Sequence, residues 1–383
     1  MKKIVLLVIG LFIFKGLNAQ DRVITTAVPF LMVTADARSA GMGDVGVATS
    51  ADGFSQQFNP AKYAFALEEQ GISLSYTPYL TALANDISLG QLNYYNRINE
   101  RSAFASSLRY FGLGEIQLTE CHDCGTIPIS PSELAFDVSY SLRLSERFSM
   151  AVAGRYIRSG LKVDLTGDMS AANTFAVDLA GYYQSEVEAY GDFDGRFRAG
   201  FNIQNLGPKI NYDDEIGDLN SNFIPTNLRL GAGFDFIMDD YNTIGVTLEA
   251  GKLLVPTPQY TEDMTSDERD QATDDYLRTN WFSGVFESFG DAPDGFSEEL
   301  KEFTLGGGVE YSYQDSFALR LGYFNEHETK GARKYFTLGA GFKYNVVKID
   351  VSYLMSTSKV QNPLENTLRF SLTFNFGDKY DEY

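Results

Sequence analysis

The stretch LRFSLTFNF, residues 368–376, decides the fold because apolar and polar side chains alternate along it without a break. Its two faces would be an apolar one and a polar one, made respectively of Leu368, Phe370, Leu372, Phe374 and Phe376, and of Arg369, Ser371, Thr373 and Asn375. A period of two residues indicates a β-strand. Nine residues is also the length that a tilted strand needs to cross a bilayer. We therefore predict a membrane-crossing strand here.

Similar alternating stretches recur along the chain, and together they predict an all-β protein. Their even number suits a 14-stranded antiparallel transmembrane β-barrel. We expect strands near residues 71–77, 86–95, 102–112, 133–144, 148–159, 173–186, 195–204, 226–237, 241–252, 301–312, 315–325, 332–344, 346–356 and 366–376.

The connections between these strands alternate between short and long. Tight turns are expected at residues 145–147, 238–240, 313–314 and around Asn345. Long loops are expected at residues 113–132, 160–172, 205–225 and 253–300. Short periplasmic turns opposite long outer loops are typical of outer-membrane barrels. A soluble β-sandwich, the competing interpretation, does not explain this asymmetry.

Composition is compatible with a barrel, because lipid-facing and lumen-facing residues cancel in any window of sequence. The mean hydropathy is -0.18 although 44% of the residues are hydrophobic. The net charge of -20 argues against nucleic acid as a partner and against adhesion of the chain to anionic lipid.

The N-terminus reads as a secretory signal peptide. Lys2 and Lys3 precede the apolar stretch 4–14, and small residues suit cleavage after Ala19. A buried helix is the alternative interpretation. We expect residues 1–19 to be the signal peptide, 20–70 a plug folded into the periplasmic end, 71–376 the barrel and 377–383 a periplasmic tail.

The polar faces of several strands carry arginine. A charge that faces lipid at mid-membrane costs about 2–4 kcal/mol, so these arginines should point into the lumen. They are Arg109, Arg143, Arg198, Arg229, Arg320 and Arg369. We expect them to pair with Asp137, Asp178, Asp235, Glu249, Glu310 and Asp350. Such a lumen suits either a polar channel or a cross-braced, closed interior.

Two short motifs have alternative interpretations. The glycines Gly41, Gly43 and Gly46 match G-x-G-x-x-G, but no βαβ pattern surrounds them. They are better explained as tight turns of the plug. Cys121 and Cys124 flank His122 and Asp123 in an outer loop, where a disulfide is favoured over a metal site that lacks a fourth ligand.

Nothing in the sequence favours catalysis. The two histidines, His122 and His327, both fall in predicted loops, where neither is placed to serve a lipid-facing hydrolase. We therefore expect no enzyme activity, no cofactor and no metal.

The loop at residues 253–300 is the most unusual segment. It holds twelve acidic and two basic residues, hence half of the net charge. The acidic part, up to Asp275, is expected to be mobile in the isolated protein. A helical period then relates Trp281, Phe282, Val285, Phe286 and Phe289. These five are our candidate partner-binding residues. The alternative is that this helix packs on the barrel's own rim.

One resemblance adds to this interpretation. The run from Asp36 to Asp44 (DARSAGMGD), followed by Phe58-Asn59-Pro60-Ala61, resembles the FadL superfamily of fourteen-stranded outer-membrane barrels. Over nearly the whole mature chain it is most similar to the PorV/PorQ branch, and within it to PorV-type proteins. The plug motif is thus Gly41, Gly43, Gly46, Asn59 and Pro60.

The resemblance implies a function in the type IX secretion system of the Bacteroidetes. Members bind the C-terminal signal domains of cargo at the translocon barrel, then pass the cargo to a cell-surface processing and attachment complex. FadL-like relatives instead carry fatty acids or other hydrophobic solutes, which is the alternative function. In either case the partners include outer-membrane lipids and not nucleic acid.

Overall fold

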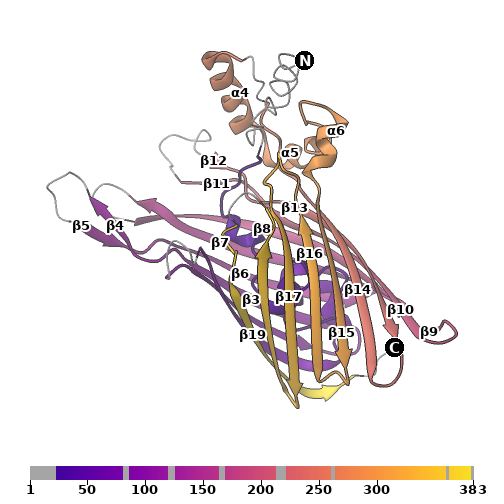
Figure 1. Cartoon of the computed structure of the whole chain (residues 1–383). Helices are drawn as coiled ribbons and strands as arrows, with labels where there is room; N and C mark the ends of the chain where they lie inside the picture. The colour runs from indigo at the N-terminus through magenta and orange to yellow at the C-terminus, as the bar shows by residue number, and fades with distance from the viewer. Residues whose placement is uncertain are drawn as a thin grey trace, which may run out of the picture.

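The structure is a computed structural model of the chain. It describes residues 23–80, 86–119, 126–163, 169–212, 221–259, 264–358 and 362–380. Long strands form a barrel, and the larger helices gather at one end of it (Figure 1). Within the described ranges, no helix is long and apolar enough to cross a membrane.

Fourteen strands of the described chain form a closed antiparallel β-barrel, which confirms the predicted fold. Each pairs with its neighbours in chain order, and the last strand pairs with the first to close the wall. The strands are β1 (Glu68–Pro78), β2 (Ser88–Arg97), β3 (Ser102–Gly112), β6 (Ser132–Arg143), β7 (Phe148–Val163), β8 (Met169–Gln184), β10 (Asp194–Leu206), β13 (Asn227–Ile237), β14 (Asn242–Leu253), β15 (Thr304–Tyr313), β16 (Phe317–Asn325), β17 (Lys334–Tyr344), β18 (Val347–Ser356) and β19 (Leu368–Lys379).

Alternation along each strand separates an apolar outer wall from a polar lumen. In β19, the stretch that opened the sequence analysis, Phe370 is 48% exposed on the outer wall whereas Arg369 is 1% exposed inside. In β1, Leu74 likewise faces outward while Ser73 and Ser75 are buried. Lipid would cover the outer apolar side chains, so one-sided burial is what a membrane barrel requires.

The two ends of the barrel differ as predicted. At the end that we call the turn end, neighbouring strands are joined by tight turns. One of them contains Asn345, whose φ of 52° lies in the left-handed region that Asn tolerates. A short strand at this end, β9 (Glu188–Ala189), pairs with β10.

At the opposite end, the loop end, the connections carry structure that the sequence did not predict. One loop contains the hairpin of β4 (Ile116–Thr119) and β5 (Thr126–Ile129), and another pairs β11 (Ile210–Asn211) with β12 (Ser221–Asn222). The predicted loop 160–172 is shorter than expected, because β7 and β8 continue to Val163 and from Met169.

The N-terminal segment lies inside the barrel, but not where we expected it. It contains η1 (Pro29–Met32), α2 (Ala37–Ala40), α3 (Ser55–Phe58) and η2 (Pro60–Phe65). The Ala27 amide donates to the Phe223 carbonyl at the loop end (2.9 Å), while Ala66 leads into β1 at the turn end. The segment therefore runs along the lumen instead of filling only the periplasmic end. We call residues 28–66 the plug.

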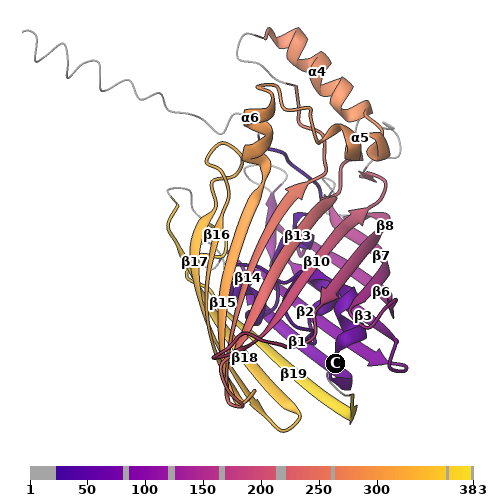
Figure 2. The same cartoon turned by 90° about the vertical axis from the view of Figure 1, so that its right-hand side faces the viewer.

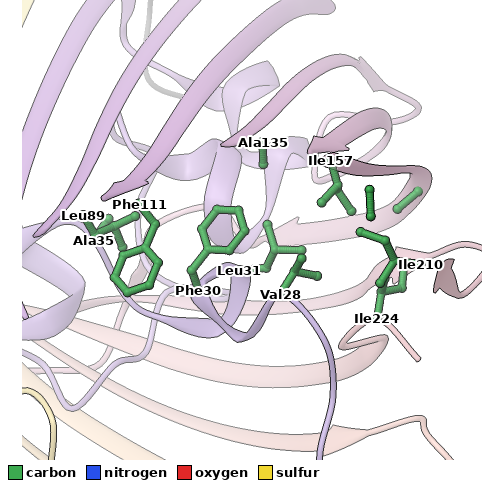
Figure 3. Packing of buried hydrophobic residues seen from close by; sticks show 12 residues of the cluster. Val28, Phe30, Leu31, Ala35, Leu89, Phe111, Ala135, Ile157, Ile210 and Ile224 are labelled. Atoms are coloured by element: carbon green, nitrogen blue, oxygen red, sulfur yellow. The ribbon is translucent and has the colours of Figure 1, made fainter. Parts of the chain in front are cut away.

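Apolar packing holds the plug toward the loop end. The Phe30 ring stacks with Phe111 of β3 at 6.1 Å between centroids, and Tyr79 meets the same Phe111 ring edge-on at 5.3 Å. Leu31 and Val28 continue this cluster toward Ile157 of β7 and toward Ile210 and Ile224 at the loop end (Figure 3). These buried apolar contacts help to hold the plug in the lumen at the loop end.

Candidate functional site

The connection between β14 and β15, residues 254–303, forms an arm that stands clear of the barrel at the loop end (Figure 2). Its helices are α4 (Ser266–Arg278), α5 (Trp281–Glu287) and α6 (Phe296–Glu299), and the short η4 (Leu300–Glu302) leads back to the wall. Residues 260–263 of the arm lie outside the described residues.

The acidic half of the arm is helical, where we had expected a segment without stable structure. Thr265 and Glu268 form a reciprocal capping box at the N-terminus of α4, and the Thr265 bonds lower the pKa of Glu268. Asp267 also lies in the first turn and Arg278 in the last, where each complements the helix dipole. No residue of α4 is buried, so end effects rather than core packing explain this helix.

The C-terminal end of α4 is tied to a neighbouring loop. The Lys209 ammonium donates to the Leu277 carbonyl at 2.6 Å and lies 4.2 Å from the centre of the Phe223 ring. The Tyr276 ring in turn contacts Phe223 at 5.2 Å. A cation near the last carbonyls of a helix is a favourable electrostatic arrangement.

Helix α5 carries four of the five aromatic and apolar residues that the sequence singled out, and the fifth, Phe289, follows two residues after its end. Val285 is 8% exposed, and a side chain added at Gly284 would meet Pro256 at 2.7 Å, so this face rests on the arm's own base. The opposite face is open: the exposed fractions of Phe282, Phe286 and Phe289 are 56%, 65% and 49%.

The rings on this open face also contact one another. Trp281 and Phe282 lie 5.6 Å apart, Phe282 and Phe286 5.4 Å apart, in edge-on geometry. We call Trp281, Phe282, Phe286 and Phe289 the aromatic face. Val285 is buried, and the Phe289 ring lies 6.0 Å from the Lys252 ammonium of β14, whereas Phe282 and Phe286 are open. That these residues bind a partner stays a prediction.

A groove of about 730 Å³ separates α4 from α5. Its apolar lining includes Met264, Tyr276 and Phe286, while Asp275 and Glu287 place carboxylates along it. The sequence did not predict this groove, because its two sides come from helices whose mutual placement depends on the Lys209 and Pro256 contacts.

A buried cluster of charges fastens the base of the arm. The Lys252 ammonium lies 2.6 Å from Glu299 and 2.5 Å from Glu302. Lys330, from the β16–β17 loop, lies 2.7 Å from Glu298 and 2.9 Å from Glu302. Each of these side chains is at least nine-tenths buried. Buried, paired charges of this kind depend strongly on one another.

Asp291 sits beside this cluster and carries a perturbed carboxyl. Burial raises the pKa of Asp291 to about 6, the Thr257 amide that donates to it at 2.8 Å opposes the shift, and Glu302 and Glu299 add to it. The base of the arm therefore contains a group that titrates near neutral pH.

The lumen contains the six arginines that the sequence placed there, and all six point inward. Arg198, Arg229 and Arg320 pair with carboxylates as expected, on Asp235, Glu249 and Glu310. Arg369 and Arg109 differ from the prediction. Arg369 pairs with Asp44 of the plug at 3.4 Å.

Arg109 and Arg143 both donate hydrogen bonds to main-chain carbonyls. Arg109 donates to the carbonyls of Phe30, Leu31 and Val33, and thereby holds the plug. Arg143 donates to the Glu146 carbonyl at 3.2 Å and lies over the Phe65 ring at 4.7 Å.

Two further arginines matter that the sequence analysis missed. Arg155 pairs with Asp137 at 3.2 Å and with Asp178 at 2.9 Å. We expected these two carboxylates to pair with other arginines. Arg38 of the plug joins Asp52 and Glu310, both at 2.7 Å, and so bridges the plug to the wall. A polar cavity of about 600 Å³ remains at the turn end beside Arg38.

The plug motif serves packing. Gly43 has a φ of 76°, and a side chain there would lie 2.6 Å from the Tyr323 carbonyl. Asn59 caps η2, because its Oδ1 accepts a hydrogen bond from the Ala61 amide. Its Nδ2 donates to the Val47 and Gly181 carbonyls at 3.0 Å.

The other glycines of the motif and Pro60 are equally confined. Gly46 leaves room for the Phe58 ring, Gly41 approaches Gly339 of the wall, and Pro60 starts η2. Cys121, Cys124 and His122 lie outside the described residues. The His327 Nδ1 lies 2.9 Å from the Thr329 hydroxyl.

Solved structures with the same architecture are known. A deletion mutant of the TodX monoaromatic hydrocarbon channel has a TM-score of 0.50 and 11% identity, over 89% of this chain and 98% of that one. The Ralstonia pickettii toluene transporter TbuX has a TM-score of 0.48 and 11% identity, over 91% and 99%. A Pseudomonas aeruginosa FadL homologue has a TM-score of 0.47 and 11% identity, over 90% and 99%. At such identities the likeness concerns the fold.

Sequence comparison is more specific. No curated protein matches the chain significantly. Residues 16–260, more than half of the chain, match the family described as type IX secretion system protein PorV. The chain therefore belongs to the PorV family of type IX secretion system proteins.

Proposed function

We propose that this outer-membrane component of the type IX secretion system binds the C-terminal signal domain of exported cargo at the translocon and delivers it to the cell-surface processing and attachment complex. The observation that carries the proposal is the aromatic face on and just after α5, whose three phenylalanines are exposed. Neither the PorV family nor FadL-type channels are enzymes, and the role proposed is one of binding.

The aromatic face has the properties of a protein-binding surface. Large exposed aromatic side chains that lie together are uncommon on a surface that stays in water. Aromatic residues also dominate the binding energy of many interfaces. Burying two such rings would contribute about 2–4 kcal/mol, which suits a complex that must later dissociate.

The arm is also held in place before any partner arrives. Val285 rests on the arm's base, Lys209 ties α4, and the Lys252–Glu302 pair fastens the return to the wall. Ordering in advance reduces the entropy lost on binding. A fixed aromatic face is thus better suited to recognition than a free loop would be.

The alternative function, a FadL-like channel for hydrophobic solutes, has less support. The plug occupies the lumen, and charged pairs such as Arg38–Glu310 and Arg155–Asp178 cross it. A path for hydrophobic solutes needs an apolar lining, whereas the cavity beside Arg38 is polar. The likeness to hydrocarbon channels concerns fold alone.

The proposal includes an orientation in the membrane. The signal peptide would be removed after Ala19, the turn end would face the periplasm and the loop end the cell exterior. Cargo then meets the arm as it leaves the translocon. Accessibility of an engineered cysteine on α4 to an impermeant thiol reagent on whole cells checks this orientation.

The decisive experiment removes two rings of the aromatic face and leaves every residue of the barrel unchanged. In the variant Trp281→Ala/Phe286→Ala, secretion of cargo and pull-down of the translocon should both fall severalfold, because two anchors are lost. The matched control is Tyr241→Ala, an exposed aromatic (54%) at the turn end, which should leave both unchanged. If the double variant assembles and both readouts equal wild type, α5 serves only the rim.

A further inference from the structure

An arginine stands on the outer wall of the barrel, on the side where lipid would lie. Arg158 of β7 is exposed, whereas its neighbours Ile157 and Ser159 are fully buried toward the lumen. The Arg158 side chain makes no hydrogen bond or ion pair with any described residue. A charge in this position would be costly in the membrane interior, so its height on the wall matters.

The surrounding rows of side chains set that height. One row nearer the turn end, the outer wall carries Phe136, Tyr156 and Phe175, which are paired across β6, β7 and β8. Tyr156 and Phe175 lie 5.3 Å apart, and Phe175 is 65% exposed. Rows of aromatic residues mark the membrane interface of outer-membrane barrels. Arg158 therefore lies at the level of lipid headgroups, at the loop end.

A groove surrounds the guanidinium. It has a volume of about 160 Å³. The wall on which it lies is made by β3, β6, β7 and β8 (Figure 1). Its lining residues are Tyr110, Ser132, Leu134, Arg158, Gly160, Ser170 and Ala171. Three hydroxyl groups and one guanidinium can donate hydrogen bonds there. Among the residues that the structure describes, this lining contains no carboxylate, in a protein with 51 acidic against 31 basic residues.

We propose that this groove binds the phosphate group of an anionic lipid in the leaflet that meets the loop end. The planar fork of an arginine matches two phosphate oxygens, and hydroxyl groups complete such a site. The acyl chains would run down the wall over Phe136 and Phe175. This site is separate from the arm and needs no cargo or translocon.

The test compares two lipids that differ only in phosphate. The purified protein, in neutral detergent, is titrated with dioleoyl phosphatidic acid or with dioleoylglycerol, and bound lipid is counted by native mass spectrometry. We expect one phosphatidic acid to be retained, and Arg158→Ala to weaken it about tenfold because a charged hydrogen-bond pair is lost. Arg269→Ala, an exposed arginine on α4, is the matched control and should bind like wild type.

Further arms separate the remaining explanations. Arg158→Lys keeps the positive charge but loses the planar fork, so it should bind phosphatidic acid with an affinity between those of wild type and Arg158→Ala. Such binding would also show that a variant at this position still folds. Equal binding of wild type and Arg158→Ala would overturn the proposal, and so would equal binding of dioleoylglycerol. If inorganic phosphate bound as tightly as phosphatidic acid, the groove would be a free-anion site and the lipid assignment would be wrong.

Discussion

At the scale of single residues, the contact between plug and wall depends on glycines on both sides. A side chain at Gly308 would lie 2.5 Å from the Met42 carbonyl, and one at Gly322 would overlap the Gly43 backbone. Wall and plug backbones therefore touch directly, which no larger residue allows. Interiors packed this closely accommodate extra atoms only by distortion.

This contact predicts the effect of one methyl group. Gly322→Ala should destabilise the barrel by about 1–3 kcal/mol, since the plug or the wall must shift. Gly154→Ala is the matched control, because a side chain on that strand glycine would meet nothing within 4 Å. The temperature at which the folded band is lost in detergent gels measures both. Equal temperatures for the two variants would contradict the described packing.

The raised pKa of Asp291 predicts a pH dependence in the arm. Its ordinary pKa is 3.8 and its folded pKa is about 6, so its stabilising effect is complete below pH 4 and is lost as the pH rises through 6. Trp281 is the only tryptophan, so quenching of its fluorescence by acrylamide should increase over this range. Asp291→Asn should make quenching independent of pH. A rise of the same size in that variant would assign the effect to another group.

The disulfide predicted from the sequence involves two cysteines outside the described residues, so it stays a prediction. Cys121 and Cys124 should be bonded to each other in protein from native membranes, because the proposed orientation places their loop in an oxidising compartment. Intact mass with and without reductant should differ by two hydrogens after alkylation is accounted for. Two free thiols in the native protein would show the prediction to be wrong.

At the scale of elements, α4 shows how end effects can order a segment that composition marks as disordered. None of its residues is buried, and its first turn relies on Thr265 and Glu268. Thr265→Ala should cost about 1 kcal/mol of helix stability and speed hydrogen exchange across residues 266–278. Thr273→Ala, inside the helix, should slow exchange or leave it unchanged, since Ala is the better helix former. Faster exchange in both variants would mean that the capping box is not what orders α4.

Sequence patterns predicted the strands well because the physical signal is local. Polar and apolar side chains alternate within one strand, so β19 and β1 could be read without knowing their partners. Arg155 was missed because its neighbours Ala151, Ala153 and Gly154 are small, which blurs the alternation. The barrel pairing then gave it Asp137 and Asp178.

The parts that could not be predicted depend on contacts distant in sequence. Lys252 and Glu302 are 50 residues apart and meet only because the arm returns to the wall. How far the plug extends along the lumen depends likewise on contacts of this kind, namely the Arg109 hydrogen bonds and the Phe30–Phe111 stacking. The helical period of residues 281–289 was visible, but which rings stay exposed was set by Pro256 and Gly284.

At the scale of the whole molecule, the barrel, the plug and the arm have separate roles. The plug and its ion pairs occupy the lumen apart from the cavity at the turn end. The outer wall is apolar, as contact with lipid requires, and the arm presents the aromatic face outside the barrel. Function in this account belongs to the arm, and the barrel is its membrane anchor. The alternative channel would instead place function in the lumen.

Isolation of the tagged protein from native membranes in mild detergent, followed by identification of what accompanies it, tests this account most directly. The account predicts that the translocon barrel and cargo with C-terminal signal domains co-purify with wild type, and are lost from Trp281→Ala/Phe286→Ala but not from Tyr241→Ala. A preparation that holds a fatty acid or other hydrophobic solute in its lumen, with neither translocon nor cargo, would contradict it.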